Sequence, residues 1–116
     1  MDALERSILW LGVEDYTGLW EAVLEVGVDA EPSSYGEARV RAGRAIRSLL
    51  TDGFIELFVC QEPMNNDSAE IVLPENYSST LREAEFWQTP EEGGKSVRFA
   101  ATEKGFAAYK KESGWT

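Results

Sequence analysis

The sequence predicts a single α+β domain in which three helices precede two antiparallel strands and a closing helix. Two observations predict this order. Helical spacing of apolar residues dominates the first fifty positions, and two short runs rich in β-branched and aromatic residues follow, about 35 residues apart. The chain has 116 residues, enough for one domain with its own core, and its hydrophobic content of 43% is typical of a globular protein.

The first predicted helix covers residues 2–11. Leu4 and Ile8 stand at helical spacing on its apolar side. Asp2 is expected to cap the first turn, because a carboxylate there accepts hydrogen bonds from free backbone N–H groups. Gly12 is expected to end the helix.

The second predicted helix begins after a turn at residues 14–17, with Thr17 as its cap. Gly27 is expected to end it, and residues 28–36, rich in Pro, Ser and Gly, are expected to form a loop. Its apolar residues are Leu19, Trp20, Val23, Leu24 and Val26.

The third predicted helix spans about residues 35–51 and has two different sides. Its apolar residues form a stripe roughly 140° wide. They are Ala38, Ala42, Ala45, Ile46, Leu49 and Leu50. Arg41, Arg44 and Arg47 are spaced by three on the opposite side, and Arg39 lies near the helix start. The segment therefore predicts an outward row of arginines on a helix whose other side belongs to a core.

Two strands and a closing helix are predicted for the second half. FIELFVC gives a strand near residues 54–60, and SVRFAAT gives its antiparallel partner near 96–101. Thr102 is expected to cap the closing helix, which ends in two lysines, where the helix dipole favours them.

An insertion of about residues 61–95 separates the two strands. Its first half is expected to hold a short strand or a docked apolar segment. Its second half predicts a short helix, capped by Thr80 or Ser79, with Leu81, Ala84 and Trp87 directed inward. Trp87 is expected to cover the sheet.

The apolar pattern also predicts which side chains meet. Trp10 and Trp20 are expected in the core, and Cys60 is expected to be a buried small hydrophobe. Trp115 is expected either to dock on the body or to be available to a partner. One shared core is expected to contain Ile46, Leu49, Leu50, Phe54, Leu24 and Phe99.

Composition excludes several classes of function. The chain has no histidine and one cysteine, so a zinc finger and a Cys–His nucleophile are excluded within it. Carboxylate pairs such as Glu91-Glu92 are expected by chance among 21 acidic residues. We therefore expect no enzyme, no catalytic residue, no metal ligand and no cofactor. Without a long apolar run or a signal-like N-terminus, we expect no membrane partner and a cytoplasmic location.

Two motifs carry a resemblance to a known family. RAGRAIRSLLTDGFIELFV resembles the recognition helix and following strand of winged helix-turn-helix domains. The matching residues are Leu49, Leu50, Asp52, Gly53 and Ile55. FAATEKGFAAY resembles the end of the wing in that family, and its matching residues are Thr102, Lys104 and Gly105. The resemblance covers most of the chain from Leu4 to Lys110. The insertion and the loop at 28–36 are both longer than the family pattern.

The resemblance implies a three-helix bundle, a wing of two or three antiparallel strands and a C-terminal helix. It also implies a DNA-binding transcriptional regulator whose third helix enters the major groove. Arg is well suited to bidentate contact with guanine and to clamping phosphate. Arg39, Arg41, Arg44 and Arg47 are therefore the candidate binding residues, with double-stranded DNA as partner.

A second hypothesis follows from the net charge of −10. An acidic winged helix would bind a basic protein, for example as an immunity or antitoxin-type protein that neutralises a basic toxin or nuclease. In that case the arginines form a solvated face, paired with acids such as Glu37 four residues before Arg41, or with Glu83, Glu85, Glu91 or Glu92 of the insertion. The sequence leaves both hypotheses open, and it leaves a homodimer open as well.

Overall fold

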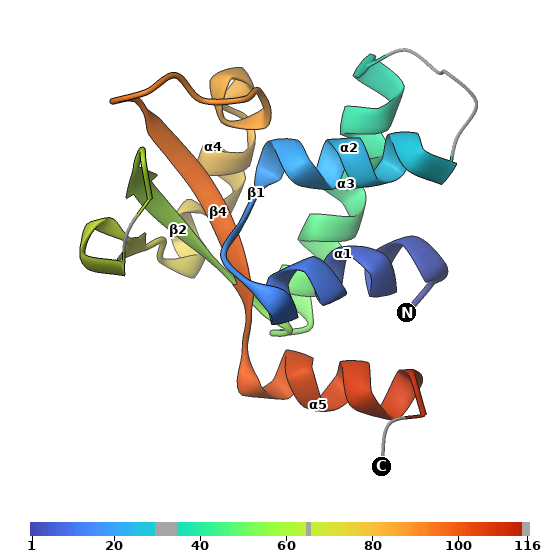
Figure 1. Ribbon diagram of the computed structural model, residues 1–116. Helices are drawn as coiled ribbons and strands as arrows, with labels where there is room; N and C mark the ends of the chain where they lie inside the picture. The colour runs from blue at the N-terminus through green and yellow to red at the C-terminus, as the bar shows by residue number, and fades with distance from the viewer. Residues whose placement is uncertain (30–34, 65, 115–116) are drawn as a thin grey trace.

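A four-stranded antiparallel sheet organises the computed structural model, which describes residues 1–29, 35–64 and 66–114 (Figure 1). The strand order is β1-β4-β2-β3, so β1, the strand nearest the N-terminus, lies beside β4 at one edge of the sheet. Leu57 of β2 stands opposite Phe99 of β4. The strands are β1 Thr17–Gly18, β2 Ile55–Gln61, β3 Glu70–Ile71 and β4 Lys95–Ala101.

Five α-helices accompany the sheet in the described part of the chain. The first three gather against one face of the sheet, and α5 packs against α1 (Figure 1). The fold is therefore α+β. The helices are α1 Ala3–Glu14, α2 Leu19–Asp29, α3 Tyr35–Thr51, α4 Tyr77–Leu81 and α5 Glu103–Glu112.

The third helix, the two strands and two helix caps are confirmed. The third helix was expected near residues 35–51, and the strands pair antiparallel as expected. Asp2 caps α1 through a capping box, in which its carboxylate accepts from the N–H of Glu5 at 2.8 Å. The hydroxyl of Thr102 accepts from the N–H of Gly105 at 3.0 Å and caps α5.

Gly12 does not end the first helix, so that prediction is wrong. The helix continues to Glu14, and Gly12 is buried inside it. A Cβ at this position would lie 3.1 Å from the ring of Phe99. The glycine therefore allows α1 to approach the sheet closely, and tertiary packing overrides its usual role as a stop.

Thr17 does not cap the second helix. It lies in β1, and its hydroxyl donates to the carbonyl of Leu11 at 2.8 Å, which satisfies the end of α1 instead. At the start of α2 the carboxylate of Glu21 accepts from the N–H of Gly18 at 2.7 Å. Gly27 is also not a stop, because α2 continues to Asp29. Positions 30–34 of the expected loop lie outside the described residues.

The core contains most of the side chains expected in it. Ile46, Leu49 and Phe99 are completely buried, Leu50 is nearly so and Phe54 is partly buried against them. The prediction that Leu24 lies in the core is wrong, because 65% of its surface is exposed. The buried stripe of α2 follows spacings of three and four, and Leu24 lies beyond it. That stripe consists of Leu19, Ala22, Val23 and Val26.

The described part of the insertion, residues 62–64 and 66–94, holds the short strand β3, the short helix α4 and three 3-10 helices, of which η1 covers Asn66–Ser68 and η2 covers Pro74–Asn76. The expected single helix is wrong: α4 ends at Leu81 and a 3-10 helix, η3, covers Ala84–Trp87. Leu81 and Trp87 are buried as expected, whereas Ala84 is exposed because the break shifts the helical register. Ser79 and Thr80 lie within α4 and cap nothing at its start.

Hydrogen bonds anchor the insertion at both ends and at its tryptophan. The N–H of Glu62 donates to the carbonyl of Gly94 at 2.9 Å, and the N–H of Gly93 donates back to Glu62 at 3.1 Å. The indole N–H of Trp87 donates to the carbonyl of Leu81 at 2.8 Å. Trp87 therefore joins the two short helices.

The other aromatic predictions are partly wrong. Trp10 and Trp20 are only half-buried: Trp10 stacks on Tyr109 with ring centroids 5.0 Å apart, and Trp20 lies under the guanidinium of Arg98 at 5.0 Å. Cys60 is buried, as expected, and burial raises the pKa of its thiol. Trp115 lies outside the described residues. No helix in the described ranges is long and apolar enough to cross a membrane.

Replacing Gly43 with alanine is expected to stabilise the protein by roughly 0.5–1 kcal/mol, because glycine within a helix costs about that much relative to alanine. Gly43 lies in the middle of α3, and the nearest contact of an added Cβ would be Trp87 at an ordinary 3.9 Å. Urea unfolding of the two proteins measures the difference.

Gly105→Ala is the matched control, and it is expected to change the free energy of unfolding in the opposite direction. A Cβ at Gly105 would overlap the carbonyl oxygen of Phe54, so this change is expected to destabilise despite the better helix propensity. If Gly43→Ala instead lowered the free energy of unfolding, the packing of α3 described above would be wrong.

Candidate functional site

Three arginines form an exposed row along α3. The buried side of this helix is filled by apolar residues, so Arg41, Arg44 and Arg47 are left on the solvent side. The structure therefore confirms their expected exposure. Arg39 differs from the row: it is half-buried, and its guanidinium lies over the ring of Trp87 at 5.9 Å.

No ion pair neutralises the arginine row within the described ranges. The pairs found there join Glu112 to Arg6 and to the N-terminal amine, and Glu62 to Arg98. Among the ion pairs of the described residues none joins Glu37 to Arg41, so the pairing expected from their spacing is not observed. The carboxylates of the insertion likewise make none with the row. The arrangement in which the insertion folds its acids across the arginines is therefore not the observed one.

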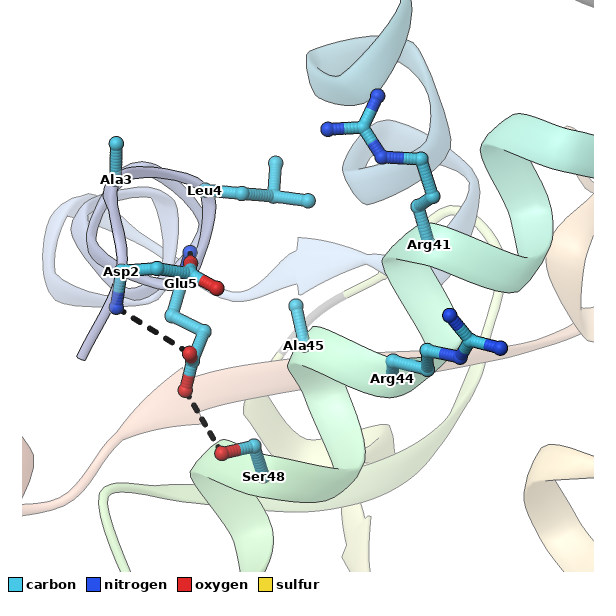
Figure 2. Close-up of a pocket in the computed structure, with 8 residues that line it drawn as sticks. All are labelled: Asp2, Ala3, Leu4, Glu5, Arg41, Arg44, Ala45 and Ser48. Atoms are coloured by element: carbon cyan, nitrogen blue, oxygen red, sulfur yellow. Dashed lines mark hydrogen bonds between the residues drawn. The ribbon is translucent and has the colours of Figure 1, made fainter.

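A cavity of about 550 Å³ separates the row from the N-terminus of α1 (Figure 2). Its acidic side is committed to local structure: the carboxylate of Glu5 accepts from the hydroxyl of Ser48 at 2.7 Å and from the N–H of Asp2 at 3.3 Å. Figure 2 shows the guanidinium of Arg44 directed away from these carboxylates and that of Arg41 directed upward past Leu4, with no hydrogen bond drawn from either to Asp2 or Glu5. The cationic ends of both side chains are thus open to solvent.

A second hollow lies on the other side of α3, between that helix and the insertion. Its volume is about 450 Å³. Arg39, Arg44 and Arg47 reach it from α3, and Arg82 reaches it from the insertion. We call it the arginine groove. Arg82 was not among the residues predicted from sequence, because only the packing of α4 and η3 brings it beside α3.

A third hollow, of about 420 Å³, continues past the end of the arginine groove. Arg47 and Leu81 line both, and Tyr77 and Ser78 of α4 line the third. Burial, and secondarily the charge of Glu56, raises the pKa of the Tyr77 hydroxyl. Tyr77 is neutral near pH 7, so its hydroxyl is a hydrogen-bond donor in a hollow that Arg47 also lines.

The guanidinium groups of this region can donate hydrogen bonds to an anion or another acceptor. Guanidinium groups donate hydrogen bonds in a fixed fork and stay charged at all ordinary pH, which suits phosphate and base edges. Among the described residues no group of three or more His, Cys, Asp or Glu side chains is placed to hold a metal ion.

Comparison with known proteins adds no relative. No protein family model matches the chain, and neither a curated protein nor a solved structure matches it.

Proposed function

We propose that this chain is a DNA-binding transcriptional regulator of the winged helix-turn-helix type, with α3 as the helix that enters the major groove. The order of elements supports the architecture. Three helices precede the strands β2 and β4, and β1, from between the first two helices, pairs with β4. The α+β topology is compatible with a winged helix whose wing carries the long insertion.

The observation that carries the proposal is the arginine row, which makes no ion pair with any residue that the structure describes. Arg41, Arg44 and Arg47 stand at spacings of three on the outward side of a 17-residue helix. Free guanidinium groups are the usual means of reading guanine in the major groove and of holding phosphates. The acidic remainder of the chain would limit binding to DNA wherever this row is not engaged.

A second candidate function rests on the charge of the whole chain. The chain has twenty-one acidic residues and eleven basic ones. The surface away from α3 therefore attracts basic partners. Under this alternative the protein binds a basic protein, such as a toxin or nuclease, through its acidic surface.

Fluorescence anisotropy with a labelled mixed-sequence duplex tests the first function. Binding is expected at low salt, about 20 mM. The logarithm of the binding constant is expected to fall linearly with the logarithm of the salt concentration, with a slope of about −3 if each arginine of the row neutralises one phosphate. Absence of binding at that salt concentration, with a correctly folded protein, would contradict the DNA function and favour a basic protein partner.

A further inference from the structure

The arginine groove has the form of a ligand site. It is a hollow of about 450 Å³ between two elements that are far apart in sequence, α3 and the second half of the insertion. This volume lies within the range of small-molecule sites. The groove is distinct from the cavity beside α1, and the two share only Arg44.

The charge of the groove is strongly one-sided. Four of the chain's eleven basic residues line it, and none of the described residues that line it is acidic. Like charges brought together repel one another, so such a cluster is most stable with an anion between the guanidinium groups. The four arginines are Arg39, Arg44, Arg47 and Arg82. A ligand with more than one negative charge is needed to balance their positive charge.

The base of the groove is apolar. Val40 is 54% exposed there, and Leu81 and Trp87 contribute buried side chains beneath it. Gly43 has no side chain, so the floor stays open beside the six-membered ring of Trp87. A ligand that filled this space with an apolar group would remove Val40 from water.

The walls are held in place before any ligand arrives. The hydrogen bond from Trp87 to Leu81 fixes η3 against α4, and Arg39 is held over the indole ring. The part of the groove formed by these contacts loses little conformational freedom on binding, whereas the exposed side chains of Arg44, Arg47 and Arg82 become ordered around the ligand.

We propose that the arginine groove binds a small organic phosphate monoester with an apolar group, the dianion held by Arg82 and the α3 arginines and the apolar group lying over Val40. Because Arg44 and Arg47 also belong to the arginine row, the bound ligand displaces DNA; this last step alone rests on the proposed function.

Isothermal titration calorimetry at pH 7.5 with three probes tests the site. Phenyl phosphate carries both features, inorganic phosphate carries only the dianion and benzyl alcohol carries only the apolar group. Phenyl phosphate is expected to bind at least about tenfold more tightly than either single-feature probe, since a buried ring adds at least that factor. Equal affinity for phenyl phosphate and inorganic phosphate would reduce the groove to an adventitious anion site and overturn the proposal.

Arg82→Gln and Lys110→Gln form a matched pair of variants. Each removes one positive charge from an exposed side chain, but Lys110 lies on α5 and does not line the groove. Arg82→Gln is expected to weaken phenyl phosphate about tenfold through loss of a charge-assisted hydrogen bond, with an unchanged circular dichroism spectrum. Equal losses in both variants would also overturn the proposal, because the ligand would then respond only to net charge.

Competition with DNA separates the two proposals. Saturating phenyl phosphate is expected to release the labelled duplex, whereas benzyl alcohol is expected to leave it bound. If the duplex stays bound while calorimetry shows that phenyl phosphate fills the groove, the proposal that the ligand displaces DNA is wrong. If the protein binds phenyl phosphate and no duplex at any salt concentration, the proposed function fails and the ligand site stands.

Discussion

Replacing Arg41, Arg44 and Arg47 together with alanine is expected to lower the affinity for duplex DNA by at least about a hundredfold. Loss of one such contact costs about 1–3 kcal/mol, so three losses at the lower limit already give this factor. The salt slope is expected to approach zero, because each lost phosphate contact reduces it by about one. All three side chains are exposed, so the variant is expected to stay folded.

The matched control replaces Lys104, Lys110 and Lys111 with alanine. These exposed lysines lie on α5, and their loss changes the net charge by the same three units. The control is expected to lose only a small part of the affinity and to retain the salt slope. If the arginine variant binds DNA as the unmodified protein does, α3 does not contact DNA, and a basic protein becomes the favoured partner.

Replacing Glu62 with alanine is expected to lower the free energy of unfolding by about 3–5 kcal/mol, the usual cost of leaving one charge of a buried pair without its partner. The carboxylate of Glu62 lies 2.5 Å from the guanidinium of Arg98, and the two side chains are only 11% and 17% exposed. Arg98 also donates to the carbonyl of Tyr16 at 3.0 Å and lies over Trp20. Urea unfolding measures the loss.

The double variant Glu62→Leu/Arg98→Met tests the cause. It removes both charges and keeps apolar volume, so it is expected to recover much of the stability lost in Glu62→Ala. Glu70→Ala, an exposed carboxylate on β3, is expected to change stability by less than about 0.5 kcal/mol. A loss below about 1 kcal/mol in Glu62→Ala would show that the Arg98 charge is hydrated without its partner.

Elements with a full local pattern could be predicted from the sequence. The 17 residues of α3 contain several helical turns, so their apolar spacing predicts both the helix and the side on which its arginines lie. The two long strands were equally clear. The β2 segment is dense in β-branched and aromatic residues, and in β4 the apolar residues alternate: Val97, Phe99 and Ala101 are separated by Arg98 and Ala100. The exposure of the arginine row follows from the same pattern, since the apolar side had to be buried.

Features set by distant contacts could not be predicted in the same way. Gly12 looks like a helix stop in sequence, but its role depends on Phe99, far away in the chain. The five residues of α4 and the four of η3 are too short to show a period, so their break was not visible. Arg82 joins the site only through this packing, and its sequence neighbours Glu83 and Glu85 give no signal of it.

Two backbone hydrogen bonds join Glu62 to Gly93 and Gly94, so the insertion begins and ends at the same place in the structure. Such a segment can be exchanged as one piece during evolution. Its first and last residues are already neighbours, so a tight turn in its place could join β2 directly to β4, at the cost of the core side chains Val72, Leu81 and Trp87. Exchanging the segment would rebuild one wall of the arginine groove while leaving the sequence of α3 unchanged. A lineage, or a protein engineer, could therefore change what the groove accepts by a graft at a single point in the chain.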